Sequence, residues 1–212
     1  MATPERIVLA SANPKKVAEL RAILDAAELD VELLARPDDV PEVVEDAPDF
    51  IGNARLKARA LVAATGEWAL ADDSGLQVDA LDGAPGVRSA RYAGESASDA
   101  DNVTLLLAEL DRVGVASGSE QSEHPVQSSR SARFRCVIVL AGPDGSEVVA
   151  EGTVEGHIAD APSGDAGFGY DPVFVPDDGD GRTFAQMSAD EKHAISHRGA
   201  ALRSLVAALR SP

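Results

Sequence analysis

The sequence predicts an α/β fold with a mixed β-sheet flanked by helices, and three observations support this prediction. Short apolar segments typical of strands alternate with segments whose apolar residues recur at helical spacing. Two β-rich segments lie on either side of a Gly-Pro-Asp-Gly turn at residues 142–145, as in an antiparallel hairpin. The length of 212 residues suits one domain, so we expect a single domain over 1–212.

The first half of the chain supplies strands and helices in alternation. Residues 6–10 form an apolar strand, and the turn at 11–14 leads into a helix over about 14–27, with Asn13 as its N-cap and Pro14 as its first residue. A second helix is expected over 52–64, where Gly66 ends it. A strand over 68–71 follows, which we expect to stop at the Asp-Asp-Ser-Gly segment of 72–75.

The second half begins with a helix over 102–110. Residues 114–131 are rich in Ser, Gly, Gln and Glu, and we expect a flexible surface loop there. The hairpin strands are expected over 134–140 and 147–154. Ser188 and Glu191 form a capping box that begins a further helix, and Gly199 marks a position where a kink or a second helix start is tolerated.

Composition excludes several function classes. Lys and Arg total 19 against 36 Asp and Glu, so the formal charge is −17, which argues against binding to nucleic acid. No apolar segment is long enough to cross a membrane and no secretion signal precedes the first strand, so we expect a soluble cytoplasmic protein. The single cysteine, Cys136, lies in an apolar strand, where a thiol usually packs as a small hydrophobe.

The turn Ser-Ala-Asn-Pro-Lys-Lys at 11–16 is a candidate phosphate site. Lys15 and Lys16 fall in the first helical turn, where the helix dipole already presents positive charge, and a bound anion would make that placement favourable. The alternative is a solvated pair of lysines on a surface helix, and the motif alone does not decide between the two.

Carboxylates at 72–73 and 42–46 are candidate magnesium ligands. Magnesium often uses one or two protein carboxylates beside substrate phosphates and water, so Asp73 together with Glu45 would suffice. Glu42 and Asp46 offer further oxygen atoms. The alternative for the Asp-Asp-Ser-Gly segment is an ordinary acidic turn.

Two segments of the C-terminal half are candidate sites for a flat ligand. The segment at 163–171 combines glycines with Phe168 and Tyr170, which suits stacking on a nucleobase, although both aromatics could instead fill the core. Lys192, His197 and Arg198 form a cationic cluster that converges only if the helix breaks near Ser196. His193 and His197 stand four residues apart, as zinc ligands often do, but a zinc site there is disfavoured because no third ligand is evident.

Six segments in the same order resemble the inosine triphosphate pyrophosphatase family, which acts on deaminated purine nucleoside triphosphates. The resemblance covers nearly the whole chain and rests on residues 11–16, 50–58, 71–76, 84–92, 168–174 and 196–199. Gly52 departs from it, because the family commonly has an acidic residue at this position. The serine-rich stretch of 114–131 is also longer than the family pattern requires.

The resemblance implies an elongated mixed sheet with two lobes, the active cleft between them, and a homodimer. It implies that ITP, dITP and XTP are hydrolysed to monophosphate and pyrophosphate with Mg²⁺. Asp73 would be the catalytic carboxylate and a metal ligand, together with Glu45. The implied substrate-binding residues are Ser11, Ala12, Asn13, Pro14, Lys15, Lys16, Lys57, Ser74, Phe168, Gly169, Tyr170, Asp171, Lys192, His197 and Arg198.

Two other functions remain open at this point. A nucleotide-binding regulator without turnover would use the same phosphate and base segments, although the paired carboxylates argue against it because a sensor of anions has no use for them without a metal. A pyrophosphatase for modified pyrimidine nucleotides is the second alternative. The segments at 168–171 and 196–199 favour purines only through the family resemblance.

Overall fold

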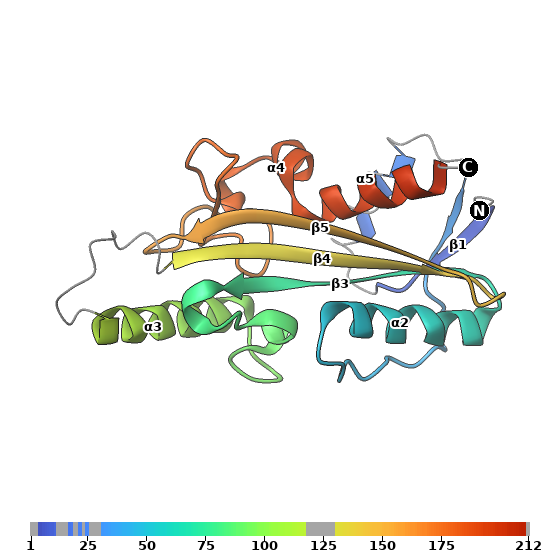
Figure 1. Ribbon diagram of the computed structural model, residues 1–212, viewed down its shortest axis with the longest axis horizontal. Helices are drawn as coiled ribbons and strands as arrows, with labels where there is room; N and C mark the ends of the chain where they lie inside the picture. Colours follow the sequence, from blue (N-terminus) through green and yellow to red (C-terminus); the bar gives the residue numbers. More distant parts are fainter. Residues whose placement is uncertain are drawn as a thin grey trace. The chain divides into compact units, whose positions relative to one another are not determined.

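The computed structural model of the chain describes residues 4–11, 17–18, 21–22, 24–25, 31–117 and 130–210 (Figure 1). The strands of these residues form one six-stranded sheet in the order β2-β1-β3-β4-β5-β6. β1 runs parallel to β2 and β3, whereas β5 and β6 are antiparallel, which confirms the predicted mixed sheet. The strands are β1 (Arg6–Leu9), β2 (Glu32–Leu34), β3 (Trp68–Val78), β4 (Ser131–Ala141), β5 (Glu147–Ile158) and β6 (Phe174–Pro176).

The helices connect these strands and complete the α/β fold. They are α2 (Phe50–Thr65), α3 (Asp99–Ser117), α4 (Ala189–Ile195) and α5 (His197–Arg210), with short 3₁₀ helices η1 (Asp79–Leu81), η2 (Gly86–Arg91) and η4 (Phe184–Gln186). Among the described residues, no helix combines the length and the apolar composition that a bilayer crossing requires.

The chain divides into two compact units. Unit 1 comprises Met1–Ser74, Cys136–Gly152 and His197–Pro212, and unit 2 comprises Gly75–Arg135 and Thr153–Ser196. Each unit has a hydrophobic cluster of its own.

The core of unit 1 has two faces, one on each side of β3. Leu205 and Leu209 of α5 pack in one cluster with Leu70, whereas Leu61 of α2 packs in another with Ala69. Figure 1 shows α5 and α2 on opposite sides of these strands. Because side chains alternate along a strand, even-numbered residues of β3 in this unit face α5 and odd-numbered residues face α2. Cys136 is fully buried in the α5 cluster, as predicted.

The core of unit 2 contains an aromatic cluster. The rings of Phe134 and Phe174 meet edge to face with centroids 4.7 Å apart, and Phe184 lies 5.1 Å from Phe174. Residues of α3 pack in the same cluster, among them Leu106 and Leu110. Buried aromatics contribute large apolar areas, so they stabilise this unit together with its aliphatic side chains.

Several predicted elements are confirmed, with shifted ends. α2 begins at Phe50, two residues earlier than predicted, because Asp49 caps it by accepting a 2.7 Å hydrogen bond from the Gly52 amide. Gly66 ends α2 in the left-handed region, with φ of 69°. α3 extends to Ser117, so residues 114–117 are helical rather than part of a loop. The rest of the predicted loop, residues 118–129, lies outside the described residues.

The first predicted helix is described only in part. Residues 17–18, 21–22 and 24–25 are helical, in agreement with the prediction for 14–27. Residues 12–16, which include the predicted N-cap Asn13 and both lysines, lie outside the described residues.

The prediction that β3 stops at the Asp-Asp-Ser-Gly segment is wrong. β3 continues through 72–75 to Val78, so both aspartates lie inside a strand and not at its end. Tertiary contacts outweigh turn propensity here, because Asp73 and Asp72 have buried partners, Asn53 and Arg198, on opposite faces of the sheet.

The predicted turn, capping box and helix break of the C-terminal half are confirmed. The turn of 142–146 joins β4 and β5, with the Gly142 amide donating to the Ser146 carbonyl. The capping box of Ser188 and Glu191 begins α4. The helical stretch then breaks at Ser196, whose backbone is extended, and α5 begins at His197. Gly199 therefore lies within α5 and is not the site of the break.

Candidate active site

A cluster around Asp73 is the main candidate site in unit 1. Asp73 is 7% exposed and lies on the face of β3 that α2 covers. Its Oδ2 accepts a hydrogen bond from Nδ2 of Asn53 at 3.1 Å, and its Oδ1 lies 3.4 Å from Nζ of Lys57. Asn53 and Lys57 are four residues apart and therefore share one face of α2. The helix thus presents an amide and an ammonium group to a single carboxylate.

Glu45 joins this cluster through the same lysine. Lys57 Nζ lies 3.1 Å from Oε2 of Glu45, so one ammonium group contacts two carboxylates. Burial lowers the pKa of Lys57, but the charges of Asp73, Asp72 and Glu45 outweigh that effect and raise the pKa above its ordinary value. Lys57 is therefore protonated at neutral pH and offers a fixed positive charge.

The donor set of this cluster suits a hard cation. Two carboxylates approach one point, now held by the ammonium nitrogen of Lys57, and Mg²⁺ takes oxygen ligands of this kind while it keeps waters and substrate phosphates for its other positions. The described residues contain no group of three or more His, Cys, Asp and Glu side chains that would hold a metal by themselves. A metal here would complete its coordination with water and substrate phosphates.

Asp72 lies on the opposite face of β3, against α5. Its Oδ2 accepts from Nε of Arg198 at 3.3 Å, and Nη2 of the same guanidinium donates to Oγ of Ser74 at 3.0 Å. The side chains of Asp72 and Arg198 are 2% and 1% exposed. The predicted pair Asp72-Asp73 is therefore divided between two faces, and each carboxylate has its own cationic partner.

A close approach of backbones positions Arg198. A Cβ at Gly152 of β5 would lie 2.1 Å from the carbonyl oxygen of His197 and 2.3 Å from the amide of Ala201. Only glycine allows the first turn of α5 to pack this closely on the strand. His197 lies in that turn and is 5% exposed. Ser11, the first residue of the predicted phosphate segment, follows β1 and is half-buried.

A second cluster lies in unit 2, around Asp171. Oδ2 of Asp171 accepts from Nζ of Lys192 at 2.7 Å and from the amide of Phe168 at 2.8 Å. The ammonium group of Lys192 also lies 4.9 Å from the centroid of the Phe168 ring, within the range of a cation–π contact. The aspartate thereby holds both the lysine and the loop that carries the aromatic ring.

The two aromatics of this loop differ in environment. Tyr170 is 3% exposed in the core of unit 2, and its hydroxyl donates to the carbonyl of Ser89 at 2.9 Å. Burial raises the pKa of Tyr170, so it remains a neutral hydroxyl. Phe168 is half-buried, and the neighbouring Gly169 amide donates to Oδ2 of Asp99 at 2.7 Å. Of the two rings, Phe168 has the surface that a ligand could contact.

Sequence reasoning did not single out Asn53, Asp99 or Ser89, although each holds a candidate residue. The spacing of Asn53 and Lys57 within one amphipathic helix is a signal that could have paired them. The contacts of Asp99 and Ser89 join residues 70 and 81 positions apart in the sequence, and no local pattern reports such a contact.

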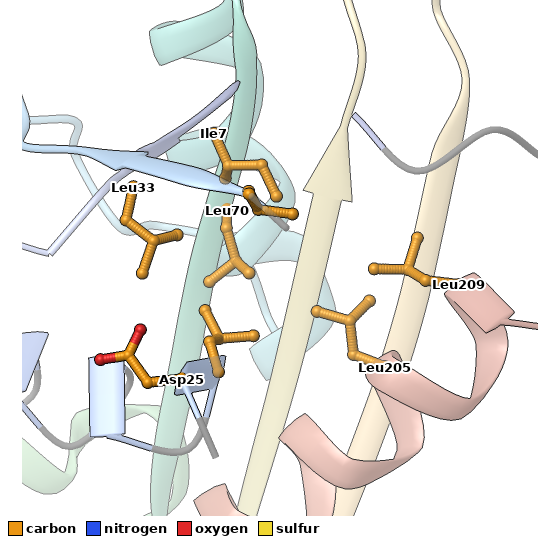
Figure 2. Close-up of a pocket in the computed structure, with 8 residues that line it drawn as sticks. Ile7, Asp25, Leu33, Leu70, Leu205 and Leu209 are labelled. Carbon is orange, nitrogen blue, oxygen red and sulfur yellow. The ribbon is translucent and has the colours of Figure 1, made fainter. Parts of the chain in front are cut away.

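An apolar pocket in unit 1 is a separate feature (Figure 2). Figure 2 shows Ile7, Leu33 and Leu70 with Leu205 and Leu209 of α5 around it, and Asp25 at one side. Its interior volume of about 10 Å³ has room for at most about one water molecule. A nucleotide needs a far larger cleft with several polar groups, so this pocket is an imperfection of the core and not the substrate site.

Comparisons with known proteins find relatives that match nearly the whole chain. The chain is 49% identical over 207 residues to a dITP/XTP pyrophosphatase of Corynebacterium glutamicum (strain R), with 95% of each chain covered. It is 48% identical over 208 residues to a dITP/XTP pyrophosphatase of Streptomyces coelicolor, with 97% of each covered.

Solved structures show the same fold. A HAM1 protein from Coxiella burnetii superposes with a TM-score of 0.83 at 40% identity, covering 99% of this chain and 98% of the other. A nucleoside-triphosphatase described as a dITP/XTP pyrophosphatase, from Mycobacterium abscessus, gives a TM-score of 0.73 at 46% identity, with 97% and 100% covered. The sequence model of the Ham1 family matches residues 7–208, and the chain is therefore a member of the Ham1 family.

Proposed function

We propose that this chain hydrolyses deaminated purine nucleoside triphosphates, such as ITP, dITP and XTP, to the monophosphate and pyrophosphate. The observation that carries the proposal is its near-complete alignment at 49% identity with a dITP/XTP pyrophosphatase. The buried carboxylate of Asp73 beside a lysine and a second carboxylate supports the same conclusion, because phosphoanhydride hydrolysis needs such groups. The proposed cellular role is removal of these nucleotides from the pool.

The proposed mechanism is hydrolysis between the α and β phosphates without a covalent intermediate. Asp73 orients the attacking water and accepts its proton. Lys57, which stays protonated, stabilises negative charge on the departing pyrophosphate. Magnesium, bound by Asp73 and Glu45, would supply further neutralisation of the phosphate charge. Ser11 and residues 12–16 are proposed to hold the triphosphate, with Ser74 as a further substrate contact.

Two sets of residues are proposed to recognise the base and sugar. Phe168 is the stacking ring, while Gly169, Tyr170, Asp171 and Lys192 form its support and its polar rim. His197 and Arg198 are proposed to read the 6-oxo edge, which would distinguish deaminated bases from adenine. We further propose a cytoplasmic homodimer.

A nucleotide panel tests the proposed function. Purified protein with Mg²⁺ is assayed against ITP, dITP, XTP, ATP, GTP and modified pyrimidine triphosphates, with pyrophosphate and orthophosphate measured separately. We expect pyrophosphate and the monophosphate from the deaminated purines, and much slower turnover of ATP. Orthophosphate as the first product would refute the mechanism, and binding without turnover would point to a regulator. Preference for a pyrimidine would refute the substrate class.

Asp73→Asn provides the matched inactive variant. It removes the charge and keeps the size of the side chain, so the fold should persist while turnover falls about 10²- to 10⁴-fold. Melting temperature and turnover are measured on the same sample. An Asp73→Asn protein that remains fully active would mean that another carboxylate performs the reaction.

A further inference from the structure

The buried amide of Asn53 connects the two parts of the Asp73 cluster. Asn53 is 0% exposed in the first turns of α2. Its Nδ2 donates to Oδ2 of Asp73 at 3.1 Å, and its Oδ1 accepts from the backbone amide of Ala47 at 3.0 Å. Because Oδ1 must accept from that amide, the orientation of the side chain is determined, and the NH₂ group is directed to the carboxylate.

These two hydrogen bonds constrain both carboxylates of the cluster. Asp73 has one oxygen, Oδ2, engaged by Asn53, which leaves Oδ1 directed to Lys57. Ala47 lies two residues after Glu45, so the second bond of Asn53 fastens the segment that carries this other carboxylate. A single buried side chain therefore bonds both to Asp73 and to the segment that carries Glu45.

We propose that Asn53 is a positioning residue for the reaction, one that holds the Asp73 carboxylate in its reactive orientation through the Nδ2 to Oδ2 hydrogen bond. The proposal rests on the proposed function, because Asp73 is the reactive carboxylate only in that case. A buried partner of a reacting group usually changes activity about 10- to 100-fold when it is removed. Asn53 has no need to touch the nucleotide to produce such an effect.

The test compares two variants that affect the bonds of Asn53 differently. Asn53→Asp keeps the shape of the side chain and an acceptor for the Ala47 amide, but it replaces the donor to Asp73 with a carboxylate that repels it. Asn53→Ala removes both bonds and adds no charge. If Asn53 orients Asp73, both variants should lower kcat for ITP about 10- to 100-fold. If it only fastens the loop at Ala47, Asn53→Asp, which keeps that bond, should retain more of the wild-type kcat than Asn53→Ala.

The chain offers a matched control in Asn102 of α3. Asn102 is 2% exposed, its Oδ1 accepts from the Ala93 amide at 2.8 Å, and its Nδ2 donates to the Ala90 carbonyl at 3.2 Å. It is thus a similarly buried amide that also accepts one bond and donates one, but both of these bonds are to backbone groups. Asn102→Asp and Asn102→Ala should lower the melting temperature by a similar amount and leave kcat within about twofold of the wild type.

Binding is measured separately from turnover, by calorimetry with Mg²⁺ and an ITP analogue whose α and β phosphorus atoms are joined by an imido bridge. We expect the Kd of the Asn53 variants to stay within about threefold of the wild type while kcat falls, because orientation of Asp73 contributes to the transition state and not to nucleotide affinity.

Each result bears on the proposal. Wild-type kcat in Asn53→Asp, or an equal loss of kcat in the Asn102 variants, would overturn it while the proposed function stands. A loss of affinity that accounts for the whole loss of kcat/KM would overturn it as well. A wild-type chain that releases no pyrophosphate from ITP would refute the proposed function itself, and with it the role of Asn53.

Discussion

At the scale of single residues, the two neighbouring aspartates of β3 perform different tasks because a strand sends them to opposite faces. Asp73 faces α2 and its lysine, while Asp72 is buried with Arg198. Removal of two charges from water is costly, and a buried pair offsets that cost only while both partners are present. Asp72 is therefore expected to support the fold and the orientation of Ser74, and it need not react with substrate.

A double-mutant cycle on Asp72 and Arg198 tests this structural role. Asp72→Asn and Arg198→Met should each destabilise the protein by about 3–5 kcal/mol, because each leaves the other charge buried without its counter-charge. The double variant should lose less than the sum, by about 0.5–3 kcal/mol. Urea unfolding measures all four proteins. Additive losses would contradict the pairing.

Arg59→Met serves as the control. It removes an exposed ion pair with Glu147 and should lower the free energy of unfolding by at most about 1 kcal/mol.

At the scale of elements, the position of α5 depends on one glycine. Gly152→Ala would place a methyl group 2.1 Å from the carbonyl oxygen of His197 and 2.3 Å from the amide nitrogen of Ala201. We therefore expect a loss of about 1–3 kcal/mol, and slower turnover because Arg198 moves with the helix. The control is Gly114→Ala in α3, where a Cβ meets nothing within 4 Å and the change should stabilise by about 0.5–1 kcal/mol. Urea unfolding curves that shift in the same direction for both variants would contradict this account.

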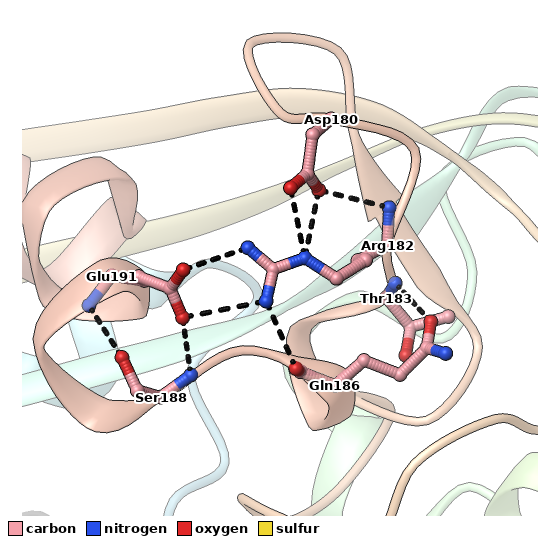
Figure 3. Close-up of polar contacts among 6 residues, drawn as sticks. All are labelled: Asp180, Arg182, Thr183, Gln186, Ser188 and Glu191. Atoms are coloured by element: carbon pink, nitrogen blue, oxygen red, sulfur yellow. Dashed lines mark hydrogen bonds and ion pairs between the residues drawn. The ribbon is translucent and has the colours of Figure 1, made fainter.

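The start of α4 has an acid-sensitive contact. Arg182 donates to both carboxylate oxygens of Glu191, which also accepts from the Ser188 amide to close the capping box (Figure 3). The Arg182 contact, followed by the Ser188 hydrogen bonds, lowers the pKa of Glu191 from 4.5 to about 2. Because the folded pKa is the lower one, the ionised carboxylate stabilises the fold above pH 4.5, and this stability is lost as the pH falls towards 2.

Glu191→Gln isolates that contribution. Glutamine keeps the capping bond but has no charge, so the variant should be less stable than the wild type at neutral pH and should approach it as the pH falls from about 4.5 to about 2. Urea midpoints at a series of pH values measure the difference. A difference that stays constant with pH would show that Arg182 does not lower the pKa of Glu191.

The elements also show what the sequence can and cannot predict. The capping box at Ser188, the left-handed Gly66 and the turn of 142–145 were predicted correctly because each depends on residues adjacent in the chain. The end of β3 was predicted wrongly. The local preference of Asp-Asp-Ser-Gly for a turn is overcome by partners on α2 and α5, among them Asn53 and Arg198, which are distant in sequence.

At the scale of the whole molecule, the chain carries a formal charge of −17 and yet is proposed to bind a polyanion. Lys57 of the Asp73 cluster, and by our proposal Lys15 and Lys16, would attract the nucleotide at short range. The net charge acts over the Debye length, which is about 30 Å at 0.01 M salt and about 8 Å at 0.15 M. At low ionic strength the approaching nucleotide is therefore expected to experience repulsion from most of the protein, and at physiological ionic strength mainly the charges closest to it.

This difference in range predicts an unusual dependence on salt. With Mg²⁺ fixed and in excess, kcat/KM for ITP should rise about twofold or more between 0.01 and 0.15 M NaCl, because screening weakens long-range repulsion and raises the association rate. The kcat at saturating ITP should stay nearly constant, since the bound nucleotide is already past that barrier. Initial rates at low and at saturating ITP separate the two parameters. If kcat/KM instead fell steadily with salt, attraction by Lys57 and the lysines of 15–16 would control the encounter even at long range, and the net charge would have no part in it.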